Sequence, residues 1–485
     1  MNRMHYTPYT CMFLLLVMLP GCYQYRHTTD KELESVREKA KQALDYDFEW
    51  GTKPHARGGE YHSDDEVLTL KSAIHHGTLI DPVLEAFFEQ LGINKADFVQ
   101  ACHFQNPIFN YTVQYPKSMC SQTLIYGFLS MNINDFWQIP RRKKVAQTEL
   151  EITTVAAFQR ILEVKAAIEN AYFKYLFEKM QFATADKMNT LTKAMRESIE
   201  QKYYAGYQSD FDRYVGDSFV TLNDIRIIEQ RRSLTNATTT LRNAIGLDLN
   251  NKPINIIEDT WEKLFVPLPS AEELLAYAKQ QKPELQIARM RIRQAQEQQA
   301  LERSKIIDNV QFGVSWTGIF PTPPSADLPT GTPRTFDFGP YVLLSLPIFD
   351  QRQMAIERVY RLEKKSRKEL EALEGALLEE IHNLHANITA SREKIEKYKT
   401  KLMPAVDAAM DYAQKFDATL QIGFSVFFSS GLTLVEQEFL MNAEYLNLAA
   451  LTSALEKTIG GSLEQILVKY DNSGTMNMSG YTEYT

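Results

Sequence analysis

Four short segments of the chain alternate between apolar and polar residues. In residues 108–115 every second side chain is apolar, and residues 310–317 repeat this arrangement. A period of two is the signature of a β-strand whose two faces meet different surroundings. Residues 122–132 and 336–346 alternate more weakly. We therefore predict four strands in two pairs. The clearest polar positions are Asn110, Thr112, Gln114, Gln311 and Ser315.

Two much longer segments have the period of a helix. Apolar residues recur at steps of three and four through residues 157–175 and 373–402, which is coiled-coil spacing. Proline, which a helix interior tolerates badly, is absent from 141–252 and from 348–403. The pattern predicts a helix over 135–204, of ~70 residues and ~105 Å. It predicts a second over 351–420, with Asp350 as its N-cap and a kink at Pro404.

The chain carries two copies of one plan. Residues 128–135 match 343–350 at a shift of 215 positions, and Gly206 matches Gly423 at a shift of 217. Gly246 matches Gly461 at 215. Each copy reads as a helical stretch, two strands, a long helix, a turn at a glycine, and a return helix that ends at Gly246 or Gly460. We interpret this as an internal duplication.

These patterns divide the chain into segments. The fold class is mainly α with a smaller membrane β part, and the predicted long helices pair as coiled coils. The predicted divisions are a signal peptide at 1–21, an N-terminal lipidated arm at 22–65, the first repeat at 66–249, a connector at 250–281, the second repeat at 282–466 and a flexible tail at 467–485.

Composition and charge exclude several functions. The chain has 53 basic and 61 acidic residues, a net charge of −8, which argues against a nucleic-acid binder. Its 44% hydrophobic content is too high for a disordered protein. No phosphate-binding loop, dinucleotide fingerprint, catalytic triad spacing or cysteine metal motif occurs in the sequence. We therefore expect no enzymatic activity, no cofactor and no metal.

The N-terminus indicates the compartment. The apolar run at 12–19 is too short to span a bilayer and fits the core of a secretory signal. It is followed by Leu19-Pro20-Gly21-Cys22, which resembles a bacterial lipobox. The resemblance implies cleavage before Cys22, lipid attachment to its thiol and, with Tyr23 next, sorting to the outer membrane. The alternative is a plain signal peptide with an incidental cysteine. Whether Cys102 and Cys120 pair stays open.

The four strands have the length that crosses a membrane as β-structure, but they cannot do so alone. An open sheet edge in lipid leaves backbone groups without hydrogen bonds. Four strands are also too few to close a barrel around a channel. We therefore expect several chains to share one barrel, and the long helices to need neighbours along their length. The alternative is that the strands form ordinary soluble hairpins.

In this order of elements the chain resembles the outer-membrane efflux protein (TolC-like) family, in its lipoprotein branch. The likeness runs from about residue 66 to 466. It is carried by Ser-Leu-Pro-Ile-Phe-Asp at 345–350 entering a long helix, by Leu-Met-Pro at 402–404, and by the two tip glycines with the glycines that end the return helices.

The resemblance implies a homotrimer that places twelve strands in one β-barrel and continues it as an α-barrel tunnel in the periplasm. An equatorial domain, residues 250–281 with the chain ends, would surround the tunnel. The family serves as the exit duct of tripartite efflux pumps or type I secretion. Its partners are a periplasmic adaptor protein, an inner-membrane transporter and outer-membrane lipid. The expected location is therefore the outer membrane, lipid-anchored and extending into the periplasm.

The resemblance also implies functional residues at the tips. The family's adaptor contact corresponds to Ala205, Gly206 and Tyr207 in the first repeat and to Ile422, Gly423 and Phe424 in the second. Acidic residues that narrow the closed tip correspond to Asp210 and Asp212. The second repeat departs from this pattern and has Phe427 and Phe428 in an apolar run, which we interpret as an apolar constriction. The alternative is that these two side chains only pack between helices.

Two other functions remain open at this point. A periplasmic adaptor is also often a lipoprotein with a helical hairpin, but adaptors do not show a duplicated strand–helix plan. A coiled-coil lipoprotein could act as a spacer without a pore.

Overall fold

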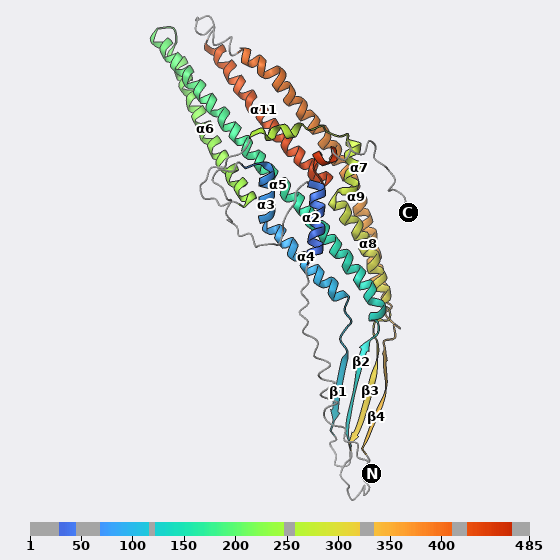
Figure 1. Cartoon of the computed structure of the whole chain (residues 1–485). Helices are drawn as coiled ribbons and strands as arrows, with labels where there is room; N and C mark the ends of the chain where they lie inside the picture. The colour runs from blue at the N-terminus through green and yellow to red at the C-terminus, as the bar shows by residue number, and fades with distance from the viewer. Residues whose placement is uncertain are drawn as a thin grey trace.

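The computed structural model of the chain describes residues 29–44, 68–115, 122–246, 258–320, 334–409 and 424–467. The molecule is elongated, with a β-sheet at one end and the tips of long helices at the other (Figure 1). Cys22, Cys120, Ile422 and Gly423 lie outside the described residues.

One antiparallel sheet contains the four predicted strands. These are β1 (Ile108–Gln114), β2 (Thr123–Asn132), β3 (Val310–Phe320) and β4 (Thr335–Leu344), in the order β1-β2-β3-β4. The register places Tyr111 opposite Gly127, Gly127 opposite Trp316 and Trp316 opposite Phe338. Each repeat thus supplies one hairpin, and among the described strands β1 and β4 each have a single neighbour.

Four helices continue the strands in the same lateral order. Next to the sheet the wall consists of α4 (Pro82–Ala101), α5 (Asp135–Tyr204), α8 (Pro283–Ser304) and α9 (Gln353–Lys397), each packed on the next. Ion pairs join neighbouring helices, such as Arg293 to Glu151 between α8 and α5 and Arg289 to Glu374 between α8 and α9. Since α4 leads into β1, β2 into α5, α8 into β3 and β4 into α9, the sheet and the helical wall form one continuous layer.

The long helix of the first repeat has the predicted bounds of 135–204. It turns back into α6 (Asp210–Ile245), which ends at Gly246 in the left-handed conformation. The return helix of the second repeat is α11 (Phe424–Ile459), followed by left-handed Gly460. Left-handed backbone at a helix end favours glycine because it has no Cβ to clash.

The long helix of the second repeat differs from the prediction in two places. Its N-cap is Arg352, not Asp350; the Asp350 carboxylate instead accepts a hydrogen bond from the Arg352 backbone N–H at 2.7 Å. Near the predicted kink, a π-helical segment (Tyr398–Leu402) interrupts the α-helix directly before Met403 and Pro404. A proline ring clashes with the carbonyl of the residue four positions earlier, and the wider turn relieves this contact.

Shorter helices pack on one side of the wall near its middle. We call them the belt: α2 (Asp30–Leu44), α3 (Leu70–Ile80), the 3₁₀ helix η1 (Glu258–Phe265) and α7 (Ala271–Gln281). The predicted helical stretches at 66–104 and 271–308 are each split in two, because Pro82 and Pro283 begin new helices. Capping boxes start several helices, including Thr69 with Ser72 and Ser270 with Glu273.

The main hydrophobic core lies where the belt meets α5, α9 and α11. Tyr172, Leu274, Leu377, Leu448 and Ile459 are fully or almost fully buried there. The core therefore joins both repeats to the belt at mid-length, away from the sheet and from the tips.

Among the residues that the structure describes, no helix combines the length and the apolar character needed to cross a lipid bilayer.

Candidate functional site

One face of the sheet is apolar along all four strands. Residues that are opposite each other in the register share a face, and on this face Thr123 is the single polar side chain of the described strands. Several of these side chains are strongly exposed, Phe338 at 70%. The larger members are Phe109, Tyr111, Val113, Ile125, Leu129, Met131, Phe312, Val314, Trp316, Phe320, Phe336, Phe338, Val342 and Leu344. A surface of this kind is stable against lipid but not against water.

The opposite face is mostly polar. It carries the five polar positions predicted from the alternation, together with Ser130, Asn132, Thr317 and Asp337. Asp337 is the one charged residue within the four described strands. The Ser130 hydroxyl donates a hydrogen bond to the Gln311 side-chain oxygen at 2.9 Å. A sheet with one lipid-compatible face and one polar face matches the wall of a water-filled barrel.

A glycine allows the aromatic side chains of the apolar face to pack. A Cβ atom at Gly127 would lie 2.6 Å from the Trp316 ring, so the indole covers the backbone at this position. The Trp316 and Phe109 rings are 5.6 Å apart. An aromatic ring that covers a glycine in a strand stabilises the sheet at a position that glycine would otherwise weaken.

Aromatic residues also gather where the sheet joins the helices. The Trp137 indole N–H donates to the Ser304 carbonyl at 3.4 Å, and the rings of Phe104 and Phe136 lie 5.3 Å apart. The three aromatic residues are exposed. Such rings are typical of the boundary between the bilayer and water.

The tip of the first repeat is a tight turn. Gly206 has φ +79°, its N–H donates to Tyr203 O at 2.9 Å, and the Tyr207 N–H donates to Lys202 O at 2.8 Å. This pair of hydrogen bonds is a Schellman motif, which satisfies the last carbonyls of α5. Ser209 then caps α6. The predicted turn at Gly206 is confirmed.

Aromatic side chains surround this turn and are strongly exposed. Tyr204 is 77% exposed, Tyr207 70% and Phe211 74%. The Arg213 guanidinium lies 5.0 Å from the Tyr203 ring and 5.4 Å from the Tyr214 ring. Tyr207 was predicted from the sequence, whereas Tyr204, Phe211 and Tyr214 were not. Their spacing of three along α6 was the signal for the last two.

The two acidic residues predicted for the gate lie in the first turn of α6. The Asp212 carboxylate accepts hydrogen bonds from the Ser209 N–H at 3.1 Å and hydroxyl at 2.7 Å, so it completes a capping box. Asp210 is 3.9 Å from Arg213. Its hydrogen bond with Tyr203 raises the pKa of that phenol. Whether these acids narrow a pore stays a prediction.

Three more of the predicted tip residues belong to the start of α11. Phe424 begins α11, and Phe427 and Phe428 fall in its first turns, but their side chains belong to the part of the chain that the structure leaves undescribed. Their assigned roles, like that of Cys22, therefore stay predictions.

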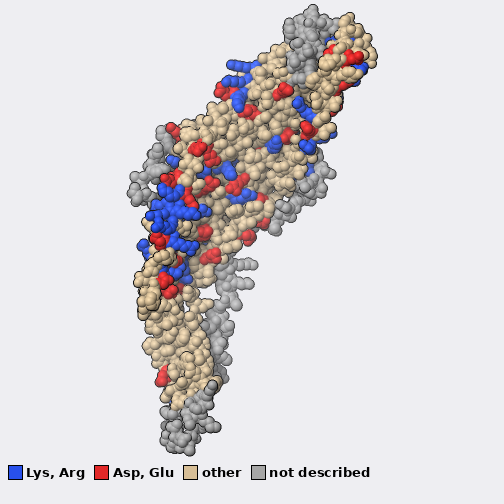
Figure 2. Space-filling model, turned by 180° about the vertical axis from the view of Figure 1, so that it is seen from behind, with Lys and Arg blue, Asp and Glu red and all other residues tan. Residues whose placement is uncertain are grey.

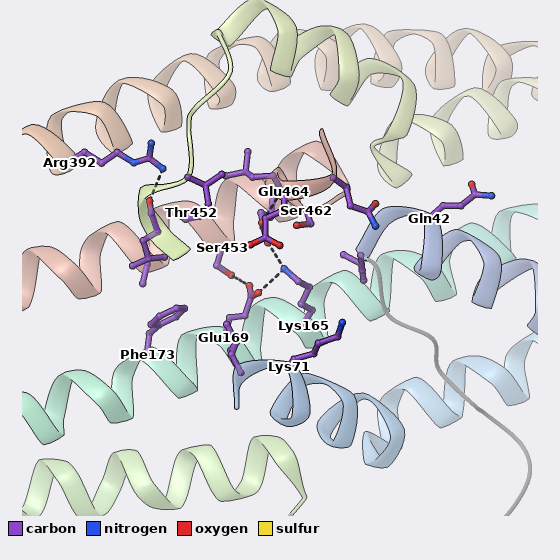
Figure 3. A pocket seen from close by; sticks show the side chains of 18 residues that line it. Gln42, Lys71, Lys165, Glu169, Phe173, Arg392, Thr452, Ser453, Ser462 and Glu464 are labelled. Carbon is purple, nitrogen blue, oxygen red and sulfur yellow. Dashed lines mark hydrogen bonds and ion pairs between the residues drawn. The ribbon is translucent and has the colours of Figure 1, made fainter. Parts of the chain in front are cut away.

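A buried charge cluster, which was not predicted from the sequence, joins the two repeats (Figure 3). Lys165 on α5 bonds to Glu169 at 2.7 Å and to Glu456 on α11, and the Ser453 hydroxyl donates to Glu169 at 2.8 Å. Burial lowers the pKa of Lys165, but the two carboxylates outweigh it and the net shift is upward. Burial raises the pKa of Glu169, partly offset by Lys165. The cluster fixes the register between α5 and α11.

This cluster lies on the wall of a cavity of about 630 Å³ between the belt, α5 and α11. Arg392 is at another side of the cavity, where it donates to the Leu264 carbonyl at 2.7 Å (Figure 3). The charged groups of the cluster already bind one another, and within the described ranges no cluster of His, Cys, Asp and Glu could hold a metal ion. The arrangement is that of a structural tie.

The chain matches no protein-family model, and no curated protein matches it by sequence. Its fold, however, is similar to solved outer-membrane proteins. CusC, a transmembrane channel, has a TM-score of 0.67 at 12% identity, covering 87% of this chain and 99% of its own. VceC of Vibrio cholerae has a TM-score of 0.64 at 14% sequence identity, and the match covers 81% of this chain and 96% of VceC. The CmeC outer membrane channel of Campylobacter jejuni has a TM-score of 0.64 at 12% sequence identity, and the match covers 83% of this chain and 88% of CmeC. The chain therefore has the fold of the TolC-like outer-membrane efflux channels, as its sequence predicted.

Proposed function

We propose that this protein is the outer-membrane exit duct of a tripartite efflux or type I secretion system. The observation that carries the proposal is the continuous layer: four strands with one apolar and one polar face extend into four helices in the same lateral order. A sheet of this kind is stable in a bilayer only as part of a closed barrel with the apolar face outward. The polar face then lines a passage that continues between the helices.

The two open edges of the layer support a trimer. Pairing β4 of one copy with β1 of the next satisfies both edges, and the same operation brings α9 against α4 of the neighbour. Three copies give twelve strands, enough to enclose a water-filled passage. The exposed apolar side chains Val83 and Ile93 on α4 are consistent with a covered edge.

The tips support the partner assignment. The turn at Gly206 ends the first hairpin at the far end from the sheet, and its exposed aromatic residues form an apolar surface in which Arg213 is fixed between two rings. Aromatic residues and arginine dominate the energetics of protein interfaces. In this proposal a periplasmic adaptor binds here and connects the duct to an inner-membrane transporter, while lipid on Cys22 anchors the chain to the outer membrane.

The alternatives explain less. A periplasmic adaptor or a spacer without a pore would leave the apolar face of the sheet in water, where a surface of this size promotes aggregation. The exposed rings at the junction of sheet and helices would also have no partner. The duct accounts for both with one placement in the membrane.

Single-channel recording in planar bilayers tests the proposal. The purified trimer should conduct, and its band should shift when the sample is heated before electrophoresis. Phe338→Arg places a charge on the apolar face and should lower the stability of the inserted trimer by about 2–4 kcal/mol. The matched control, Thr317→Arg, places the same charge on the polar face beside Asp337. Equal stability of the two variants in lipid would refute the membrane placement, and a trimer without conductance would refute the duct.

A further inference from the structure

A dense patch of basic residues lies on the helical wall close to the sheet. Figure 2 shows Lys and Arg gathered there, next to a sheet that is nearly free of charge. Residues 352–368 carry seven basic and two acidic residues, whereas 369–380 carry five acidic residues and no basic one. The patch is thus strongly positive in a chain whose net charge is −8.

The contacts of α8 and α9 show which side of the wall carries part of this patch. Arg289 donates to the Lys279 carbonyl of α7 at 2.9 Å and pairs with Glu374 at 3.4 Å, so this side of α8 and α9 faces the belt. Gln296 is seven residues, or about two helical turns, from Arg289, and Glu363 is eleven residues, or about three turns, from Glu374. Gln296 donates to Glu363 at 3.0 Å on the same side. Each residue turns an α-helix by about 100°.

Three basic residues point away from the belt by the same rule. Arg291 is two residues from Arg289, or about 200° around α8. Arg358 is five residues from Glu363, about 140° around α9, and Lys365 is one heptad beyond Arg358. All three are exposed. Arg291 and Arg358 have no ion-pair partner among the described residues, and Lys365 pairs with Glu369 at 3.5 Å.

The side away from the belt is the side that lines the tunnel. In the proposed trimer the belt must lie outside, because three copies of it inside would fill the passage. Three basic side chains from each of three copies then form rings around the tunnel just inside the barrel. Rings of Arg and Lys favour anions, and a narrow passage with low-dielectric walls strengthens their field.

We infer that this duct selects for anionic solutes, and that Arg291, Arg358 and Lys365 are the residues that do so. The inference rests on the proposed function and adds the charge class of what passes. Acidic side chains follow on α9 toward the middle of the wall, so the positive field is confined to the end next to the membrane.

The reversal potential under a KCl gradient tests this inference. Replacing Arg291, Arg358 and Lys365 together by Gln should lower the chloride-to-potassium permeability ratio of the trimer by at least about threefold. The control replaces Arg303, Lys364 and Arg367 by Gln. It removes the same charge from each chain but leaves the three tunnel residues in place. Reversing two charges, with Arg358→Glu and Lys365→Glu, should lower the ratio further.

The outcomes separate the inference from the proposed function. Conductance with a ratio that changes no more in the tunnel variant than in the control overturns the anion selectivity and leaves the duct intact. Absence of any conductance from the folded, unaltered trimer overturns the duct and the selectivity with it. A larger loss in the tunnel variant than in the control supports both.

Discussion

The two long helices occupy equivalent places in the two repeats, but their surroundings differ. Of the 70 residues of α5, 29 are buried, against seven of the 45 in α9. α5 packs on α4, α6, α8, α11 and two belt helices, and it runs without interruption, whereas α9 has a free side and breaks at Tyr398–Leu402. The same plan thus yields a central pillar in one repeat and an edge helix in the other.

One sequence plan thus serves two mechanical roles. The pillar holds the protomer together through contacts within the chain, including its charged tie to α11. In the proposed trimer the exposed side of the edge helix faces a neighbouring copy, and the π-helical segment interrupts this helix after Lys397. Changes in α5 should therefore mainly alter the stability of the protomer, and changes in α9 should mainly alter the movement of the edge helix.

The largest expected effect comes from removing the buried lysine of the pillar. Lys165→Met leaves Glu169 and Glu456 buried beside each other without their cation, which should lower the free energy of unfolding by about 3–5 kcal/mol. The control is Lys187→Met, which removes an exposed ion pair to Glu438 between the same two helices and should cost less than about 1 kcal/mol. Chemical denaturation measures both. Similar losses of unfolding free energy in the two variants would show that the buried cluster does not hold α5 and α11 together.

The edge helix offers the next test. Pro404→Ala removes the ring that prevents regular α-helix, so the π-helical segment should close and the helix should gain up to about 3 kcal/mol. Slower hydrogen exchange of the 398–405 amides would measure this, and a stiffer edge helix should lower the open probability of the proposed channel. Pro140→Ala in α5, where the helix is regular, is the control. A change in gating from Pro140→Ala as large as that from Pro404→Ala would contradict the comparison.

Alkaline pH should weaken the tie in the unaltered protein. The carboxylates hold the pKa of Lys165 above its ordinary value of 10.5, so the folded chain keeps this proton longer than the unfolded chain. The stabilisation is therefore complete below pH 10.5 and is lost as the pH rises through the folded pKa. The loss should amount to about 1.4 kcal/mol per pH unit. Thermal unfolding measures this, and Lys165→Met should lack this part of the pH dependence.

The smallest effect is expected at the tip of the pillar. Gly206→Ala introduces strain at φ +79°, but its Cβ would have no atom within 4 Å, so the cost should be about 1 kcal/mol. Gly246→Ala at the base of the same hairpin also brings a Cβ within 2.7 Å of Ile80 and should cost more. Thermal unfolding of the two variants shows which substitution costs more stability. A greater loss at Gly206 would mean that the tip has contacts within the protomer.

Much of the fold followed from the sequence because its signals were long and uninterrupted. α5 has no proline after Pro140, so its end was fixed by Gly206 alone, and the alternation of the strands gave their bounds and faces. The exact start of α9 was harder to predict, because a turn and a helix N-cap compete for the same side chain. Asp350 has the side chain of an N-cap, yet it closes a turn ahead of the helix, which begins after Arg352 instead.

The buried cluster could not be predicted for a different reason. Lys165 and Glu169 are four residues apart on a helix, the spacing of an ordinary surface ion pair. Glu456, which makes the site a tie between repeats, is 291 positions from Lys165 in sequence. The tip was partly foreseen because a glycine turn is a local signal, whereas the exposed aromatic residues around it look like core residues in sequence alone.

The two open edges of the sheet have a consequence for the biogenesis of the protein. Before it meets its neighbours, a single copy presents unpaired strand edges at β1 and β4 and an apolar face rich in aromatic rings. Exposed edges of this kind pair readily with other chains and lead to aggregation. For the proposed trimer, a newly exported copy therefore has to be shielded until its neighbours cover these edges, so membrane insertion and closure of the barrel are expected to be one concerted step.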